Sequence, residues 1–91
     1  MKIVVMCGIG LGTSAILKVN TERALERLDI DASVLATDVA GVRAAAADAQ
    51  VILTSSELVD AIGKTNADVI VINNYFDVDE LVVKLDIALG S

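Results

Sequence analysis

Four short apolar runs divide the chain, and three of them are rich in the β-branched residues that favour strands. The runs cover residues 3–6, 32–36, 51–53 and 69–72. Between them lie longer stretches with helical periodicity or with turn residues. Short apolar runs that alternate with helical segments predict parallel strands joined by crossover helices.

The first intervening segment predicts a helix that begins at Thr13 or Ser14 and ends near Leu28. One face of this helix is apolar and the opposite face carries charges that we expect in water. The apolar face consists of Leu17, Thr21, Ala24, Leu25 and Leu28, and the charged face of Lys18, Glu22, Glu26 and Arg27.

Three further helical segments are expected. Residues 38–48 read as a loop with a short helix, because Gly41 interrupts the pattern. Ser55 or Ser56 is a candidate cap for a short helix over residues 57–62, which Gly63 closes. Residues 77–80 have the form of a capping box before a last helix that ends at Gly90. The buried face of that helix is expected to hold Leu81, Val82, Leu85, Ala88 and Leu89.

These elements predict an α/β domain over residues 1–91, with a doubly wound, four-stranded parallel sheet in the order 2-1-3-4 and helices on both faces. The order follows from right-handed crossovers with one reversal. Such sheets bind ligands beyond the carboxyl ends of the strands at the reversal. Cys7 stands at that end of the first strand.

Composition narrows the functional classes. The chain is 55% hydrophobic and its aromatic residues are Tyr75 and Phe76, so we expect a core of aliphatic side chains. A single cysteine forms no internal disulfide, and no signal-like segment begins the chain, which favours a cytoplasmic location. No apolar run approaches the ~18 residues of a membrane span. The net charge of −6, without a cluster of lysine and arginine, argues against nucleic acid. With no histidine and one cysteine, neither a metal site nor a cofactor is expected.

The segment after the first strand carries the candidate chemistry. It reads Cys7-Gly8-Ile9-Gly10-Leu11-Gly12-Thr13-Ser14. A glycine-rich strand-to-helix loop directs backbone amides and the positive end of a helix dipole at one point, which suits a dianion. The same field stabilises a thiolate and lowers the pKa of a cysteine from its free value of about 8.5. The pattern favours phosphoryl transfer through Cys7.

Other interpretations fit this segment less well. A dinucleotide site needs a different glycine spacing and more residues than this chain offers, even with Asp38 as a ribose ligand. A nucleotide-hydrolysing phosphate loop needs lysine where Gly12 stands. A cysteine phosphatase needs arginine where Thr13 stands, and the first arginine is Arg23. Its general acid would come from Asp38, Glu57 or Asp77. Cys7 as a plain core residue and the glycines as simple turn formers are the remaining alternatives.

The loop motif, the length and the four-strand pattern resemble the IIB components of the bacterial phosphoenolpyruvate-dependent sugar phosphotransferase system. The resemblance covers essentially the whole chain and extends to the ascorbate/galactitol and lactose/cellobiose-like groups, with the loop looking more like the ascorbate-type branch. It implies a Rossmann-like, low-molecular-weight-phosphatase-like fold and a phosphoryl carrier. The alternative in the same architecture is a phosphatase-like hydrolase.

The resemblance also implies roles and partners. Cys7 would accept the phosphoryl group from a phosphohistidine of a IIA protein and pass it to a sugar bound by a membrane IIC protein. The chain would then sit at the inner membrane only through IIC. The phosphate would be bound by Gly8, Ile9, Gly10, Leu11, Gly12, Thr13 and Ser14.

Several residues near the expected crevice have open roles. Ile9 and Leu11 either dock on partner proteins or pack under the loop. The ends of the third and fourth strands carry Thr54, Ser55, Ser56, Asn73 and Asn74, which either steady the phosphoryl group or act as turn and cap residues.

Overall fold

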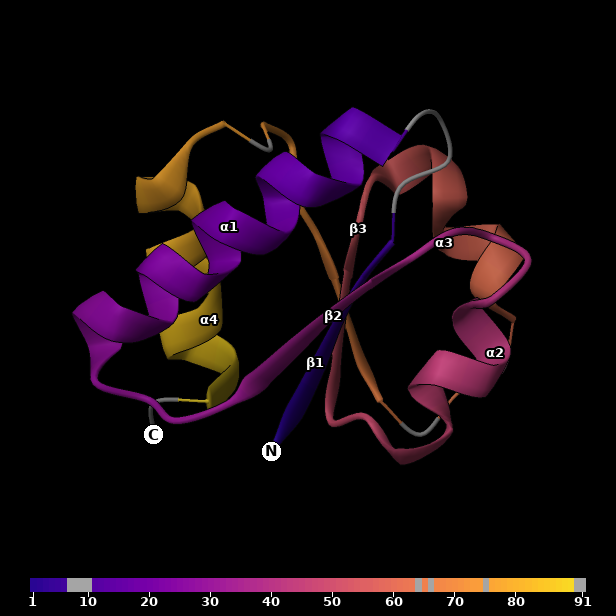
Figure 1. Ribbon diagram of the computed structural model, residues 1–91, viewed down its shortest axis with the longest axis horizontal. Coiled ribbons are helices and arrows are strands. Elements are labelled where there is room, and N and C mark those ends of the chain that lie inside the picture. The colour runs from indigo at the N-terminus through magenta and orange to yellow at the C-terminus, as the bar shows by residue number, and fades with distance from the viewer. Residues whose placement is uncertain (7–10, 64, 66, 75, 90–91) are drawn as a thin grey trace.

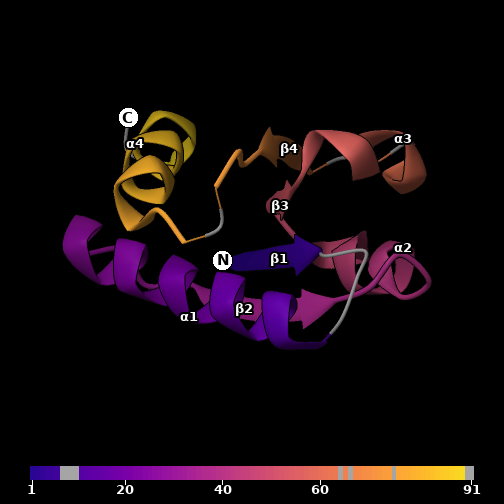
Figure 2. The same cartoon turned by 90° about the horizontal axis from the view of Figure 1, so that it is seen from above.

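Four parallel strands form one sheet in the order β2-β1-β3-β4, as the sequence predicts. They are β1 (Lys2–Met6), β2 (Ser33–Thr37), β3 (Val51–Thr54) and β4 (Asp68–Val71). The computed structural model describes residues 1–6, 11–63, 65, 67–74 and 76–89, and the side chains of these apart from residues 11–14. Figure 2 shows the strands between two helical layers.

The two central strands are the most apolar part of the molecule. Residues 3–6 of β1 and all of β3 are fully buried, and Val5 pairs with Leu53 between them. The edge strands β2 and β4 are partly exposed. Both edge strands lie one residue from their predicted positions: β2 begins at Ser33, whose amide donates to Met1 (2.9 Å), and β4 begins at Asp68 opposite Val51. Pairing register, rather than the apolar run alone, sets these boundaries.

Helices cover both faces, which confirms the doubly wound arrangement. One layer consists of α1 (Leu11–Leu28) and α4 (Val78–Leu89), and the other of the short α2 (Val42–Ala45) and α3 (Val59–Ile62) (Figure 1). Two short 3₁₀ turns, η1 (Ala46–Asp48) and η2 (Ser56–Leu58), adjoin the second layer. Each layer has its own core, and the one beneath α1 and α4 includes Leu17, Leu81 and Leu85.

Helix α1 buries the predicted apolar face but starts earlier than predicted. Leu17, Thr21, Ala24 and Leu25 are buried, and the Thr21 hydroxyl donates to the Leu17 carbonyl oxygen (2.7 Å) as threonine does inside helices. The helix begins at Leu11, not at Thr13 or Ser14. Gly12 suggested a loop because glycine disfavours helix interiors, but the first turn tolerates it.

The short helices follow the predicted positions with changed boundaries. Residues 38–48 hold α2 and η1, and the predicted helix over 57–62 is η2 followed by α3. Gly63 ends α3 at a φ of 70°, which confirms its predicted role. Gly41 precedes α2 at a close approach, because a Cβ there would lie 2.7 Å from Thr37 Oγ1.

The two described chain ends lie at the same end of the sheet. Met1 precedes β1 at the amino ends of the strands. Helix α4 runs back from the carboxyl end of β4, so that Leu89 returns to the same side, and Figure 1 shows this arrangement. The carboxyl ends of the strands are free of both.

Candidate functional site

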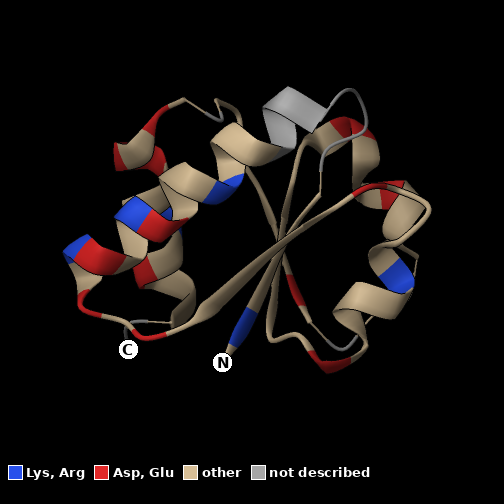
Figure 3. Cartoon of the chain, in the orientation of Figure 1, with Lys and Arg blue, Asp and Glu red and all other residues tan. Residues whose placement is uncertain are grey.

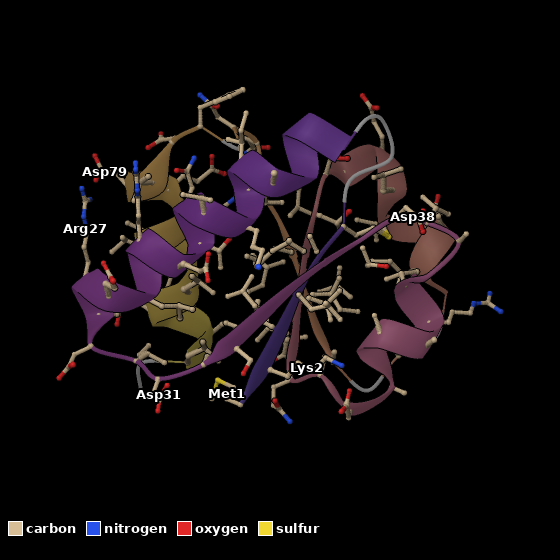
Figure 4. All side chains as sticks on the ribbon, viewed as in Figure 1. Met1, Lys2, Arg27, Asp31, Asp38 and Asp79 are labelled. Atoms are coloured by element: carbon tan, nitrogen blue, oxygen red, sulfur yellow. The ribbon has the colours of Figure 1, made fainter. Side chains whose placement is uncertain are left out.

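The carboxyl ends of all four strands meet at one edge of the sheet, because the strands are parallel. The residues there are Met6, Thr37, Thr54 and Val71. Figure 4 shows Asp38, the residue after β2, at this end, and Met1, Lys2 and Asp31 at the opposite end. The strand order reverses between β1 and β3, which places the expected crevice at Met6 and Thr54.

The predicted phosphate-binding residues fall into two groups. Cys7, Gly8, Ile9 and Gly10 lie outside the described residues. Leu11, Gly12, Thr13 and Ser14 form the first turn of α1. Thr13 and Ser14 were expected at the start of this helix, whereas Leu11 and Gly12 were assigned to the loop, which is corrected here. Amides in a first helical turn have no carbonyl partner within the helix, so they remain available to an anion. Met6, directly before Cys7, is fully buried.

The amino end of α1 is electrostatically open. This 18-residue helix has no acidic residue in its first turn and has Arg27 in its last. The other long helix differs, because α4 carries Asp79 and Glu80 in its first turn. Acidic side chains at a helix amino end offset the positive end of the dipole. Of the two long helices, α1 is the one that leaves this charge to a ligand.

Hydroxyl groups follow the end of β3. Thr54 is fully buried, Ser55 half-buried and Ser56 exposed. Ser55 precedes η2 in an extended conformation but makes no side-chain cap hydrogen bond, and α3 has none either, so the predicted serine cap is wrong. The local backbone therefore does not use these hydroxyls as caps.

The end of β2 is a tight turn. The Gly41 amide donates to Asp38 Oδ1 (2.8 Å), and this bond holds the turn that leads into α2. Asp77, a second candidate acid, accepts the Glu80 amide on Oδ1 (3.2 Å) as the cap of α4. Two of the three candidate acids of a phosphatase mechanism thus serve turns and caps.

The Glu80 carboxylate holds the turn after β4, although the sequence placed Glu80 in the capping box of the last helix. Glu80 accepts the Asn73 amide on Oε2 (2.8 Å) and the Asn74 amide on Oε1 (3.0 Å). The predicted capping box is thus half formed: Asp77 caps as expected, while Glu80 reaches back to β4. Lys84 Nζ donates to Glu80 Oε2 (2.7 Å) and to the Val71 carbonyl oxygen (2.5 Å). The i,i+4 spacing of Glu80 and Lys84 is the sequence signal that marks this pair.

The Glu80 carboxylate is more acidic than usual. Desolvation raises the pKa of Glu80. Hydrogen bonds from Lys84 and from the amides of Asn73 and Asn74, together with the Lys84 charge, lower the pKa by more than desolvation raises it. The net pKa lies below the ordinary value of 4.5. A folded-state pKa below the unfolded one adds stability above pH 4.5, and this stability is lost as the pH falls through the folded value.

Replacing Glu80 with glutamine is expected to lower the free energy of unfolding by about 1–2 kcal/mol at pH 7, because a charge-assisted hydrogen-bond acceptor is lost. Urea unfolding over a range of pH values measures this, and the difference between the two proteins should shrink as the pH falls through the lowered pKa of Glu80. Asp79→Asn is the control, since the Asp79–Arg27 pair is exposed and should contribute only tenths of a kcal/mol. Equal losses for the two variants would contradict this account.

Arginine side chains lie away from the crevice. Arg23 is exposed on α1, and at 1.5 Å per residue it lies about 18 Å along the helix from Leu11. Arg27 pairs with Asp79 (2.8 Å), as Figure 4 shows, and Arg43 lies beside Gly63 at the end of α3. Figure 3 shows the acidic residues spread around both helical layers. A guanidinium clamp of the phosphatase type is thus not formed by these three arginines.

An apolar hollow on α1 escaped the sequence reasoning. It has a volume of about 250 Å³ and is lined by Ala15, Ile16, Val19 and Asn20, one to two turns from the start of the helix. Ile16 and Val19 are 38% and 45% exposed. The sequence signal for this hollow was that Ile16 and Val19 are apolar but lie outside the predicted buried face of the helix. Polar residues next to them in the sequence obscured this signal.

Two classes of feature are absent from the described part of the chain. It contains no group of three or more histidine, cysteine, aspartate or glutamate side chains suited to a metal ion. Among its helices, none combines the length and the apolar character that a membrane crossing requires.

The chain was compared with models of known protein families. The model of the family described as "PTS system, Lactose/Cellobiose specific IIB subunit" matches residues 2–84. This match is to the lactose/cellobiose group, and it does not support the ascorbate-type branch that the loop motif favoured. No curated protein matches the chain significantly.

Proposed function

Because the chain belongs to the lactose/cellobiose-specific IIB family of the sugar phosphotransferase system, we propose that it carries a phosphoryl group on Cys7. Proteins of this family are phosphotransferase components that work with IIA and IIC partners. In the proposed cycle, one domain spanning residues 1–91 takes the group from a IIA phosphohistidine and delivers it to a sugar bound by IIC. The chain itself would be cytoplasmic and would meet the membrane through IIC.

The place of Cys7 carries this proposal. It directly follows the buried end of β1 and precedes α1, whose first turn has free amides and no acid. Cys7, Gly8, Ile9, Gly10, Leu11, Gly12, Thr13 and Ser14 would then form the site. Positioning and electrostatic stabilisation supply most of the catalysis in phosphoryl transfer, and this end of α1 offers both.

Both transfers balance without a cofactor. In the first, the Cys7 sulfur attacks phosphorus, the S–P bond forms as the donor N–P bond breaks, and the thiol proton ends on the imidazole nitrogen. In the second, a sugar hydroxyl oxygen attacks phosphorus, the S–P bond breaks, and the hydroxyl proton ends on the cysteine.

The apolar hollow at Ile16 and Val19 supports a protein partner beside this site.

The remote arginines favour a carrier over a hydrolase. A phosphatase clamps the equatorial oxygens with arginine, which strengthens attack by water, whereas a carrier must keep the group until its acceptor arrives. Arg23 lies too far along α1 for such a clamp.

The test is phosphorylation with purified components. With the general phosphotransferase proteins, a lactose/cellobiose-type IIA protein and labelled phosphoenolpyruvate, the chain should take up one phosphoryl group and hold it far longer than a catalytic turnover. Membranes that contain the matching IIC protein should discharge it onto cellobiose or lactose. Rapid turnover of an aryl phosphate by the isolated chain would instead support the hydrolase.

A further inference from the structure

The most exposed apolar side chains of the molecule gather on one element. Among the large hydrophobic residues that the structure describes, the three with the highest exposed fractions are Ile87 (77%), Phe76 (68%) and Val83 (58%). Val83 and Ile87 lie in α4, and Phe76 lies in the turn that precedes it. Single exposed apolar residues are common on protein surfaces, but a group of them marks an interaction site.

Acidic residues share the exposed side of α4 with this apolar pair. Leu81 and Leu85 bury the opposite side of the helix in the core. The exposed side chains are set three or four residues apart along the helix, so they lie together: Asp79, Val83, Asp86 and Ile87. These four residues and Phe76 are called the α4 surface below.

The α4 surface starts at the same edge of the sheet as the proposed site. Phe76 follows β4, whose end lies at the carboxyl edge of the sheet with the end of β1. Ile87 is nine residues beyond Val78, which corresponds to about 14 Å along the helix axis. A partner that reaches the carboxyl edge can therefore also cover this flank of the domain, where Figure 2 shows α4 on the side of the sheet away from α2 and α3.

The charges of the α4 surface select a basic partner. Asp86 forms no ion pair with the described residues, and Asp79 pairs with the exposed Arg27. Lys84 is the one base of α4, but its Nζ is engaged by Glu80 and by the Val71 carbonyl oxygen. Figure 3 shows acidic residues along α4. Apolar side chains flanked by acids complement a surface with apolar residues flanked by lysine and arginine.

We propose that the α4 surface docks on the basic cytoplasmic loops of the membrane IIC partner. This inference rests on the proposed function. Cytoplasmic loops of membrane proteins carry an excess of lysine and arginine, which gives IIC the required chemistry. The lipid around IIC does not, because the cytoplasmic leaflet is negative and repels a chain with a net charge of −6. The hollow at Ile16 and Val19 is made by other residues and stays available to the IIA donor.

The test measures binding of the chain to vesicles that contain a lactose/cellobiose-type IIC protein, together with loading by IIA. The double variant Val83→Ser/Ile87→Ser should bind these vesicles roughly tenfold more weakly, because apolar contacts at the centre of the interface are lost. Asp86→Lys should weaken binding several-fold at low salt and less at high salt, since salt screens exposed charges. In discharge assays both variants should raise KM for IIC and leave kcat unchanged.

Two matched controls make the same chemical changes elsewhere. Leu35→Ser removes an aliphatic side chain that is 43% exposed on β2, and Asp60→Lys reverses an exposed charge on α3. Both should bind IIC like the wild type. All variants should keep a melting temperature close to that of the wild type and accept the phosphoryl group from IIA at its rate, because every changed side chain is exposed and none belongs to the proposed site.

The outcomes separate this docking role from the carrier function. Unchanged IIC binding by both α4 variants, or an equal loss in the controls, overturns the inference while the carrier function stands. Slower loading by IIA with unchanged IIC binding assigns the surface to the donor and overturns it too. Equal binding of the wild type to IIC-free vesicles of the same lipids makes lipid the occupant. A wild type that accepts no phosphoryl group contradicts the carrier function, and binding of the unphosphorylated chain to IIC still tests the surface.

Discussion

Replacing Cys7 with serine is expected to abolish phosphoryl acceptance while the fold remains intact. A serine hydroxyl at neutral pH is a far weaker nucleophile than a cysteine whose thiolate is stabilised by a helix amino end. Labelled phosphoenolpyruvate with the general proteins and IIA measures acceptance, and circular dichroism measures the fold. The expected signal is one phosphoryl group per wild-type chain and none per variant.

Alkylation of the wild-type chain checks the same assignment independently. Cys7 is the only cysteine, so the rate of labelling reports on it alone. Its dependence on pH should give an apparent pKa below the free value of about 8.5. Acceptance by Cys7→Ser at the wild-type level, or a native chain that resists labelling, is incompatible with a phosphocysteine carrier.

Introducing an acid into the first turn of α1 is expected to have the second largest effect. Thr13→Glu should lower phosphoryl acceptance by roughly ten- to hundredfold, because a negative charge within several ångströms repels a dianion. The same charge should raise the melting temperature slightly, since acidic residues stabilise helix amino ends by about 0.3–1 kcal/mol. Activity and stability should thus change in opposite directions.

Two controls isolate the charge. Thr13→Gln has nearly the same size without the charge, so it reports the cost of losing the Thr13 hydroxyl. Arg23→Glu places the same acid at an exposed position about 18 Å along α1 from Leu11, where its effect on the site should be small. If Thr13→Glu and Thr13→Gln lose acceptance equally, the open charge at this helix end is unimportant to transfer.

The sheet was predictable because its signals are local. Short apolar runs marked all four strands, and the handedness of crossovers gave the order β2-β1-β3-β4. The start of α1 was misplaced because Gly12 carries a low helix propensity that the first turn overrides. The observed boundaries of β2 and β4 differ from the predicted ones by one residue, because pairing with the neighbouring strands fixes the register.

The sequence predicted residues of the candidate site only where they belong to a recognisable motif. Cys7 and the glycines that follow were visible in the sequence and stay a prediction, since residues 7–10 are outside the described part. Glu80 fitted a capping box but binds Asn73 and Asn74, because the amides at the end of β4 also need acceptors. The buried Thr54 hydroxyl has no hydrogen-bond partner among the described residues, which depends on packing across strands that no local pattern encodes.

Met1 and Leu89 lie at the same end of the sheet, which affects how this domain could be joined to other domains. Both lie at the amino ends of the strands, across the sheet from the proposed site. A linker attached at either end would leave the site open to a tethered partner. A short flexible tether holds its partner at an effective concentration on the order of millimolar, so a fused donor would recharge the carrier without a diffusional search. The fold is thus suited to work either as a separate protein or as a module within a longer polypeptide.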